Sequence, residues 1–164
     1  MAATTSGTAK VTLPADNQIL ITREFQAPRQ LVWRAYTTPE LVKRWWAGQR
    51  GTVTSAEIDL RVGGRWRFVM TAHGGFEVAF HGEYREITEP ARLVSTEAYE
   101  GIPDPDGHAS LTTLTFTETD GRTWMEMLSE YRSRTDRDAV IESGMEGGMQ
   151  ESMDALEQVA VSLS

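Results

Sequence analysis

Three hydrophobic periods follow one another along the chain, and each predicts one part of the fold. Apolar side chains alternate with polar ones from residue 18 to 26, which is typical of a strand with one buried face. Two short helices are predicted next, beginning at Ala27-Pro28 and Thr38-Pro39, because proline is favoured in the first turn of a helix. The period is two again between about residues 52 and 131, and it becomes 3.6 from Thr135 to about Leu163, as in one long helix.

The middle part of the chain predicts a meander of six antiparallel strands. Turn-forming residues divide it into the segments 52–61, 64–71, 76–88, 92–99, 109–118 and 122–131. Asp120-Gly121 is a strong signal for a two-residue hairpin. The hairpin sets a register in which Phe116 faces Met125 and Thr112 faces Ser129. One face of this hairpin is therefore apolar near the turn and polar at the open end.

This order of elements indicates the α+β class, because sequential antiparallel strands are followed by one terminal helix. About seven strands would form a curved antiparallel sheet around the long C-terminal helix, with two short helices after the first strand. Residues 1–16 are predicted to be a flexible N-terminal tail. Residues 17–164 are predicted to form a single domain, as their length suggests.

The methionines fall on the two surfaces that such a fold brings together. Three stand four residues apart on the C-terminal helix and three lie on strands: Met145, Met149, Met153, and Met70, Met125, Met127. A methionine-rich space is adaptable in shape, which suits a pocket for an apolar small molecule and equally an ordinary core. The residues predicted to line such a pocket are Trp45, Trp66, Phe68, Met70, Phe80, Tyr99, Leu114, Phe116, Met125, Met127, Ser129, Tyr131, Met145, Gly148, Met149 and Met153.

Three glycines interrupt the predicted C-terminal helix within five residues. Gly144, Gly147 and Gly148 each cost the helix roughly 1 kcal/mol relative to alanine. A close contact between helix and sheet, a kink in the helix, or room for a ligand could offset this cost. The sequence leaves these three explanations open.

Composition and charge exclude several classes of function. The chain has 16 basic and 24 acidic side chains, a net charge of −8, which repels nucleic acids and anionic membranes. No apolar run approaches the roughly 20 residues of a membrane span, and the first ten residues lack the apolar segment of a secretory signal. The absence of cysteine excludes disulfides and thiolate chemistry. We therefore expect a cytoplasmic protein without nucleic-acid partners or membrane insertion.

The three histidines do not predict a metal site. His73, His81 and His108 are scattered, without the close spacing to other ligands that a metal needs. The segment Asp104–Gly107 matches only the start of a calcium loop and lacks its closing glutamate. His81 and Glu83 share one face of a predicted strand, which makes them weak candidates for proton transfer. No metal and no cofactor are predicted.

Several short motifs resemble one known family in their order and spacing. They are Pro39–Leu41, Trp45-Trp46, Glu57–Leu60, Gly63–Phe68, Gly82–Tyr84 and Ile87–Leu93. Over residues 18 to 163 the chain resembles the activator of Hsp90 ATPase homologue-like family, of the C-terminal-domain type, within the START and Bet v 1-like helix-grip (SRPBCC) superfamily. The resemblance implies a helix-grip fold with a cavity between the sheet and the terminal helix. The family often has an aromatic residue near Met149, so a methionine there would enlarge or soften the cavity.

Three functions are compatible with this resemblance, whose members include ligand carriers, stress proteins and cyclase-like enzymes. The first is binding of a small hydrophobic or aromatic molecule, with Ser129, Tyr131, Tyr99 or His81 orienting its polar end. The second is a polyketide cyclase or dehydratase type of enzyme that uses His81 and Glu83 in the same cavity. The third is a co-chaperone-type interaction module. It is the weakest expectation, because the chaperone activator carries a further N-terminal domain for which this chain has no room.

Overall fold

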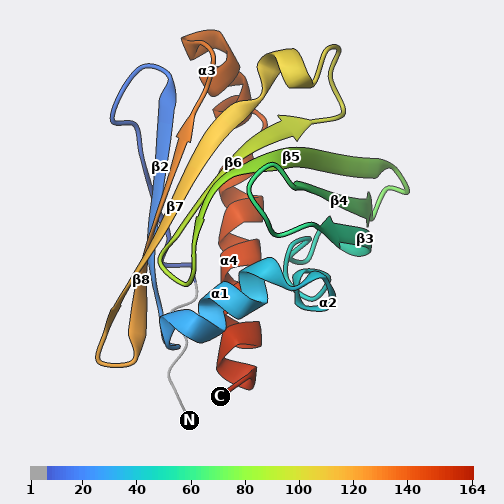
Figure 1. Cartoon of the computed structure of the whole chain (residues 1–164). Coiled ribbons are helices and arrows are strands. Elements are labelled where there is room, and N and C mark those ends of the chain that lie inside the picture. Colours follow the sequence, from blue (N-terminus) through green and yellow to red (C-terminus); the bar gives the residue numbers. More distant parts are fainter. Residues whose placement is uncertain (1–6) are drawn as a thin grey trace.

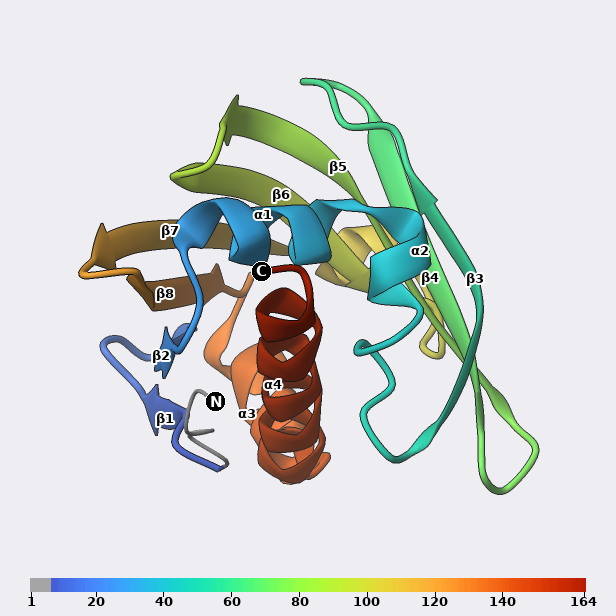
Figure 2. The ribbon, with the colours of Figure 1, turned by 90° about the horizontal axis from the view of Figure 1, so that it is seen from below.

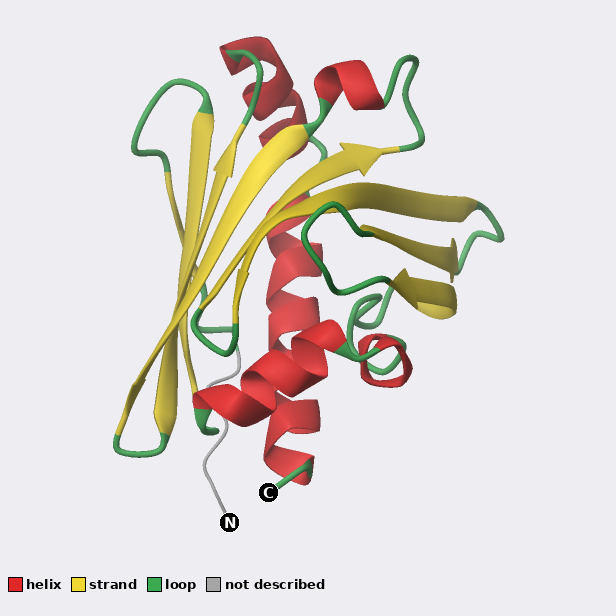
Figure 3. Ribbon diagram, viewed as in Figure 1, coloured by secondary structure: helices red, strands yellow, loops and turns green. Residues whose placement is uncertain are grey.

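One curved sheet of eight antiparallel strands surrounds the long C-terminal helix in the computed structural model, which describes residues 7–164 (Figures 1 and 3). The strands are β1 (Lys10–Thr12), β2 (Gln18–Phe25), β3 (Gly51–Ile58), β4 (Arg65–Ala72), β5 (Glu77–Thr88), β6 (Arg92–Tyr99), β7 (Ser110–Thr119) and β8 (Arg122–Glu130). Their order in the sheet is β1-β2-β8-β7-β6-β5-β4-β3. The α+β helix-grip architecture predicted from the sequence is confirmed.

The predicted hairpin register is confirmed as well. Phe116 is opposite Met125 and Thr112 is opposite Ser129 across β7 and β8. A strand's side chains alternate between faces, so this register sends Phe116 and Met125 to the concave side together. Both are fully buried there.

The sheet has one strand more than the sequence predicts. Residues 10–12, placed in the predicted N-terminal tail, form β1 and pair with Leu20–Thr22 of β2. Three residues are too few to show a period, which is why the pattern does not reveal this strand. Residues 1–6 of the predicted tail lie outside the described residues.

The two short helices α1 (Arg29–Thr37) and α2 (Pro39–Val42) follow β2 as predicted, and α1 crosses the concave side next to the C-terminal helix (Figure 2). Pro28 is the N-cap of α1, and Thr38 is the N-cap of α2 without a side-chain hydrogen bond to the helix. Trp33 of α1 is buried, and its indole N–H donates to Glu89 Oε1 at 3.1 Å.

The predicted single C-terminal helix is wrong in one respect: it is two helices, α3 (Arg134–Glu142) and α4 (Met145–Ser162). Ser133 caps α3 by accepting a hydrogen bond from the backbone N–H of Asp136 at 3.1 Å. Gly144 separates the helices with φ +80°, a left-handed conformation that glycine adopts without steric cost. The glycines therefore produce a break, and Gly147 and Gly148 then lie beside the side chain of Arg50.

Replacing Gly144 by alanine is expected to lower the free energy of unfolding by about 1–2 kcal/mol, because a Cβ disfavours the left-handed conformation. Gly147→Ala is the matched control. Its Cβ would meet only the end of the half-exposed Arg50 side chain at 2.7 Å, which can move aside. The control is expected to be neutral or to stabilise by up to about 1 kcal/mol through helix propensity. Equal losses in urea unfolding of both variants would contradict this explanation of the break.

The two halves of α4 pack differently. In the C-terminal half Leu156, Val159 and Ala160 are buried, whereas Met145 and Met149 in the N-terminal half are only partly buried. The backbone of α4 approaches that of α1 more closely than that of any strand.

Buried charges fix α4 to the edge of the sheet. Arg23 of β2 points inward and contacts Asp154 at 2.5 Å and Glu157 at 3.3 Å. Gln150 exchanges two hydrogen bonds with the backbone of Ala9, at 3.2 and 2.6 Å. These contacts hold α4 beside β1 and β2, at one side of the concave face.

Within residues 7–164, no helix has the length and apolar composition needed to cross a membrane.

Candidate functional site

A row of polar side chains crosses the concave face from β6 to the end of β8. It consists of Glu97, Thr112, Ser129 and Tyr131, and we call it the inner polar row. The Thr112 hydroxyl donates to the Glu97 carboxylate, and its oxygen lies 3.4 Å from Ser129 Oγ. Ser129 in turn is hydrogen-bonded to the Tyr131 hydroxyl. The row thus forms one connected chain of hydrogen bonds inside an apolar face.

Glu97 is the unusual member of this row. Its pKa is raised by burial, and the weaker effect of the hydrogen bond from Thr112 does not reverse the rise. No residue between positions 7 and 164 forms a salt bridge with it. By its accessible surface Glu97 is partly buried.

Two tyrosines are close enough to this carboxylate for its charge to act on them. The pKa values of Tyr36 on α1 and of Tyr131 are raised, mainly by burial and further by the negative charge of Glu97. Burial, and further the charge of Asp59, raises the pKa of Tyr84 on β5. These phenols are therefore neutral, and they offer hydroxyl groups that can both donate and accept hydrogen bonds.

Aromatic rings of β4, β5, β6 and the segment between α2 and β3 form a continuous surface, which we call the aromatic wall: Trp46, Trp66, Phe68, Phe80 and Tyr99. Trp46 contacts Phe68 and Phe80 edge-to-face, with ring centroids 5.5 and 5.8 Å apart. Trp66 lies 4.9 Å from Phe68, and Phe80 lies 5.0 Å from Tyr99. Because Tyr99 and Glu97 share a face of β6, the wall ends beside the inner polar row.

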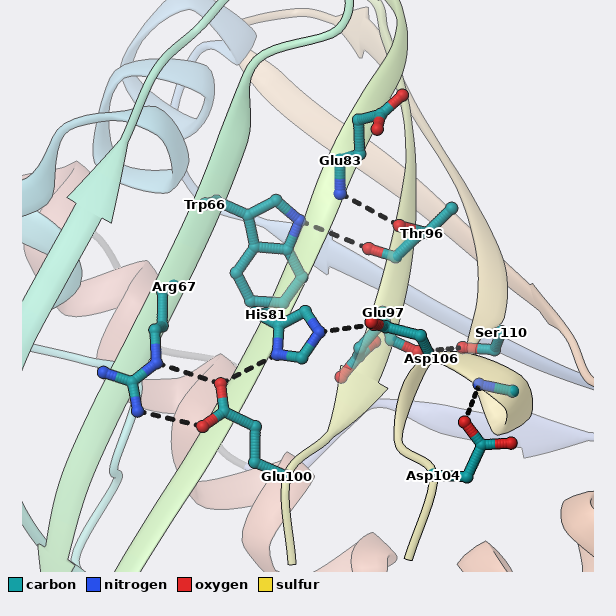
Figure 4. A network of polar contacts seen from close by, with 11 residues as sticks. Trp66, Arg67, His81, Glu83, Thr96, Glu97, Glu100, Asp104, Asp106 and Ser110 are labelled. Carbon is teal, nitrogen blue, oxygen red and sulfur yellow. Dashed lines mark hydrogen bonds and ion pairs between the residues drawn. The ribbon is translucent and has the colours of Figure 1, made fainter. Parts of the chain in front are cut away.

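Gly82 permits the position of Trp66. The Trp66 indole reaches across β5, and its N–H donates to the Thr96 carbonyl at 3.2 Å (Figure 4). A Cβ at Gly82 would come within 2.5 Å of Trp66 Nε1 and 1.8 Å of Thr96 O. The close approach of ring and backbone therefore requires glycine at this position.

A pocket of about 470 Å³ adjoins the wall at the far end of β4. It is lined by Gln49, Arg50, Met70, Ala72, His73, Gly74, Phe76 and Glu151. Met70 lies on the same face of β4 as Phe68, one pair further along the strand. Arg50 and Glu151 meet across the pocket at 3.4 Å and join the loop before β3 to α4. A second pocket of about 410 Å³ lies at the β3–β4 turn, lined mainly by charged residues and glycine, away from the inner polar row.

The structure divides the predicted pocket residues into three groups. Trp45, Trp66, Phe68, Leu114, Phe116, Met125, Ser129 and Met153 are buried. Met70, Phe80, Met127, Tyr131, Met145, Gly148 and Met149 are partly buried. Tyr99 is 40% exposed.

The predicted methionines of the sheet are not neighbours. Met70 on β4 is separated from Met125 and Met127 on β8 by β5, β6 and β7. Phe116 belongs to the packed core, where it contacts Trp33 and Tyr36 with ring centroids 6.3 Å away in each case. Alternation of apolar and polar residues predicts the face of the sheet on which a residue lies. It does not predict how far apart two strands lie within the sheet.

The two adjacent tryptophans, Trp45 and Trp46, have different environments. Trp45 is buried, and its indole N–H donates to the Ala35 carbonyl at 2.9 Å, so it is a packed core residue. Trp46 is half-buried and forms part of the aromatic wall. Its backbone carbonyl accepts a hydrogen bond from Ser152 of α4 at 2.7 Å.

His81 and Glu83 do not form the predicted pair. His81 is opposite Arg67, on the convex face, whereas the neighbouring Phe80 is opposite Phe68 on the concave face. The His81 ring contacts Glu100 at 2.8 Å and Asp106 at 2.6 Å (Figure 4). These partners come from the segment after β6. They lie too far from His81 along the chain to be predicted from the sequence around it. The placement removes His81 and Glu83 from the space between the sheet and α4.

Stability is expected to depend on pH through this convex network. The pKa of His81 is raised, mainly by its hydrogen bond to Asp106, and Arg67 lowers the pKa of Glu100 to about 2. The His81 contribution is therefore complete below about pH 6.5 and is lost as the pH rises through the raised pKa. The Glu100 contribution is present above its unfolded pKa and is lost as the pH falls towards about 2.

The measurement is urea unfolding of wild type and His81→Gln at about pH 6 and about pH 9. We expect the variant to lose more stability at the lower pH, where the wild-type imidazolium is fully paired. A difference between the proteins that is the same at both pH values would refute the assignment.

The other histidines have separate partners. His73 contacts the Gln49 carbonyl at 2.7 Å, and His108 contacts Asp136 at 3.0 Å. In the loop that resembled a calcium site, Asp104 Oδ1 accepts the backbone N–H of Gly107 at 3.3 Å. Among residues 7–164 no group of three or more histidine, cysteine, aspartate or glutamate side chains could hold a metal ion.

Sequence reasoning missed Glu97, which the structure places at the centre of the site. A signal was present, because the predicted strand 92–99 gives Glu97 the same face as Leu93 and Tyr99. An acidic residue on an otherwise apolar face is informative, since such residues are rarely buried without a partner. The register then brings in Thr112, and α1 brings in Tyr36.

Comparisons with known proteins agree with this fold. A protein from Rhodobacter sphaeroides has a TM-score of 0.85 and 25% identity, over 94% of this chain and 99% of that chain. A protein from Mycobacterium smegmatis has a TM-score of 0.79 and 27% identity, over 94% and 96%. An AHSA1-like protein from Aeromonas hydrophila, with a TM-score of 0.66 and 22% identity over 88% and 93%, shares the fold. The search of curated proteins gives no match.

Family comparison identifies the chain more directly. The model described as "Activator of Hsp90 ATPase homolog 1-like protein" matches residues 26–160, which include both α1 and most of α4. The match also spans the inner polar row and the aromatic wall. The chain therefore belongs to the activator of Hsp90 ATPase homolog 1-like family.

Proposed function

We propose that this protein binds a small apolar or aromatic molecule between the concave face of the sheet and the N-terminal half of α4. The observation that carries the proposal is the position of the inner polar row at the end of the aromatic wall. A few convergent polar groups within an apolar surface are typical of small-molecule sites, where they orient the ligand. The hydroxyls of Ser129 and Tyr131 would orient its polar end.

Methionines on both sides of this space support the proposal. Met145 and Met149 of α4, and Met127 on the same face of β8 as Ser129, are partly buried, in contrast to the fully packed Leu156. Methionine has a flexible, unbranched side chain that can rearrange around ligands of different shape. The pocket beside Met70 would be the entrance, since it adjoins the aromatic wall from outside.

Membership of the family adds a second line of support. The helix-grip superfamily that the chain resembles includes ligand carriers, and its cavity lies between the sheet and the terminal helix. The inner polar row and the aromatic wall lie on the concave face, which supports this location for the ligand. Their residues would then define which ligands fit.

The sharpest test of this function is to fill the proposed ligand space between the sheet and α4 with a larger side chain. Thermal unfolding would be measured with a library of naphthalene, flavonoid, sterol and fatty-acid compounds, using wild type, Met149→Trp and Gln158→Trp. A ligand at 100 times its dissociation constant stabilises the folded state by about 2.7 kcal/mol. We expect stabilisation of wild type and of the control Gln158→Trp, whose side chain is exposed on the same helix. Met149→Trp is expected to remain folded and to lose the response.

Two outcomes would contradict the proposal. One is that no compound stabilises the wild-type protein. The other is that Met149→Trp strongly destabilises the protein without any ligand, because that result indicates a filled core at this position.

A second function, proton transfer on a bound substrate, is favoured by one observation. Burial raises the pKa of Glu97 and brings it closer to the range useful for general acid–base catalysis. Glu97 would then take the role that the sequence suggested for His81 and Glu83 in a cyclase or dehydratase. Chemical change of a bound polyketide-like compound, abolished in Glu97→Gln, would establish this function. Unchanged compound after prolonged incubation would leave binding alone.

A further inference from the structure

We propose that the molecule bound at this site is an apolar amine, held as a cation by the carboxylate of Glu97. This inference rests on the proposed function and specifies its ligand class. The site thereby selects an ammonium group in preference to the carboxylate of a fatty acid or the hydroxyl of a sterol.

The first argument is the missing counter-charge of Glu97. A buried carboxylate is costly unless it is paired, and Thr112 supplies only a neutral hydrogen bond. Within residues 7–164 no lysine, arginine or histidine forms a salt bridge with Glu97. The remaining lone pairs of the carboxylate can accept the N–H groups of a ligand. A ligand ammonium would supply the missing positive charge.

The second argument is that the two arginines that are buried among residues 7–164 are already engaged. Arg23 is bound to Asp154 and Glu157, and Arg137 donates to the carbonyls of Ala15 and Gln18. A carboxylate ligand in this space would therefore face Glu97 without a cation to balance it. Like charges brought together in this way are mutually destabilising.

One further arginine lies at the entrance rather than at the inner polar row. Arg50 is 52% exposed and is paired with Glu151 at 3.4 Å. It can contact an anion only at the outer pocket, where water screens the interaction. This position does not offset the charge of Glu97 deeper inside.

The third argument is the chemistry of the aromatic wall. Tryptophan faces attract cations, and Trp66 and Trp46 both belong to the aromatic wall, which ends beside the inner polar row. The same rings pack against the apolar body of the ligand. The net charge of −8 also raises the local concentration of cations around the molecule. The interior acid, the aromatic wall and the overall charge thus favour the same ligand class.

The test uses three probes that share one apolar body: 2-(2-naphthyl)ethylamine, 2-(2-naphthyl)ethanol and 2-naphthylacetic acid. Their dissociation constants would be measured by calorimetry at about pH 7 and low salt. The amine is expected to bind the wild-type protein at least about tenfold more tightly than the alcohol, as a charge-assisted hydrogen bond requires. The acid is expected to bind most weakly.

Two variants with the same net charge distinguish pairing of the amine with Glu97 from attraction by the overall negative charge of the protein. Glu97→Gln, which preserves the shape of the side chain, should remove the preference for the amine and leave binding of the alcohol within about threefold. Glu83→Gln on the convex face should keep the wild-type preference. Equal losses of amine binding in both variants would overturn the proposal, because they would show a general charge effect.

The three probes also distinguish an error in the ligand class from an error in the proposed binding site. If the alcohol or the acid binds wild type as tightly as the amine, the ligand class is wrong while the site itself stands. If none of the three probes binds, and the wider library is also silent, both the ligand class and the proposed function are overturned.

Discussion

Replacing Arg23 by methionine is expected to lower the free energy of unfolding by about 3–5 kcal/mol, the usual cost of breaking a buried ion pair from one side. The Arg23 side chain is fully buried, and so is that of Glu157, which it contacts at 3.3 Å. Methionine fills a similar volume but leaves the Glu157 charge without its cation. The result would be a buried carboxylate between β2 and α4 that has lost the positive charge of Arg23.

The control for this prediction is Arg61→Met. Arg61 contacts Asp59 at 2.9 Å, but both side chains are more than half exposed. Exposed pairs contribute about 0–1 kcal/mol, so this variant should unfold nearly as wild type does. Similar midpoints for Arg23→Met and wild type in guanidinium unfolding would show that the buried pair does not anchor α4.

The second large effect is expected from Leu156→Ala, at about 2–5 kcal/mol, because this fully buried leucine belongs to the packed half of α4. Its removal leaves a cavity between helix and sheet that neighbouring side chains cannot fill. Met149→Ala, two turns earlier, removes a partly buried side chain beside the proposed ligand space. It should cost less than about half as much.

The comparison of these two variants tests whether α4 has a packed half and an open half. Urea unfolding of both proteins without ligand gives the two free energies directly. Equal losses at both positions would indicate uniform packing along α4 and would weaken the case for a ligand space.

The parts of the fold that depend on local rules were predictable from the sequence. Asp120-Gly121 specifies a two-residue hairpin, so the opposition of Phe116 and Met125 follows from a period of two. The three glycines left a kink as one of three explanations within one predicted helix, and only the positive φ of Gly144 shows the break. Strand β1 was missed because its three residues carry no periodic signal.

The candidate site was less predictable, because it depends on pairings between distant segments. His81 finds Glu100 and Asp106 after β6, and nothing near His81 in the sequence points to them. Glu97 had the correct face by alternation, but its importance depends on the absence of a cation nearby. Such an environment is set by α1, β7 and β8 together.

The most direct test of the central claim is an NMR titration of methionine methyl groups with 2-(2-naphthyl)ethylamine. The methionines report on every relevant region: Met127 and Met149 border the proposed ligand space, Met125 and Met153 lie in the packed core. We predict large, saturable shifts of Met127 and Met149, with little change at Met125 and Met153. Methyl signals that remain unchanged to saturating probe concentration, or shifts confined to Met70 at the outer pocket, would contradict ligand binding between the sheet and α4.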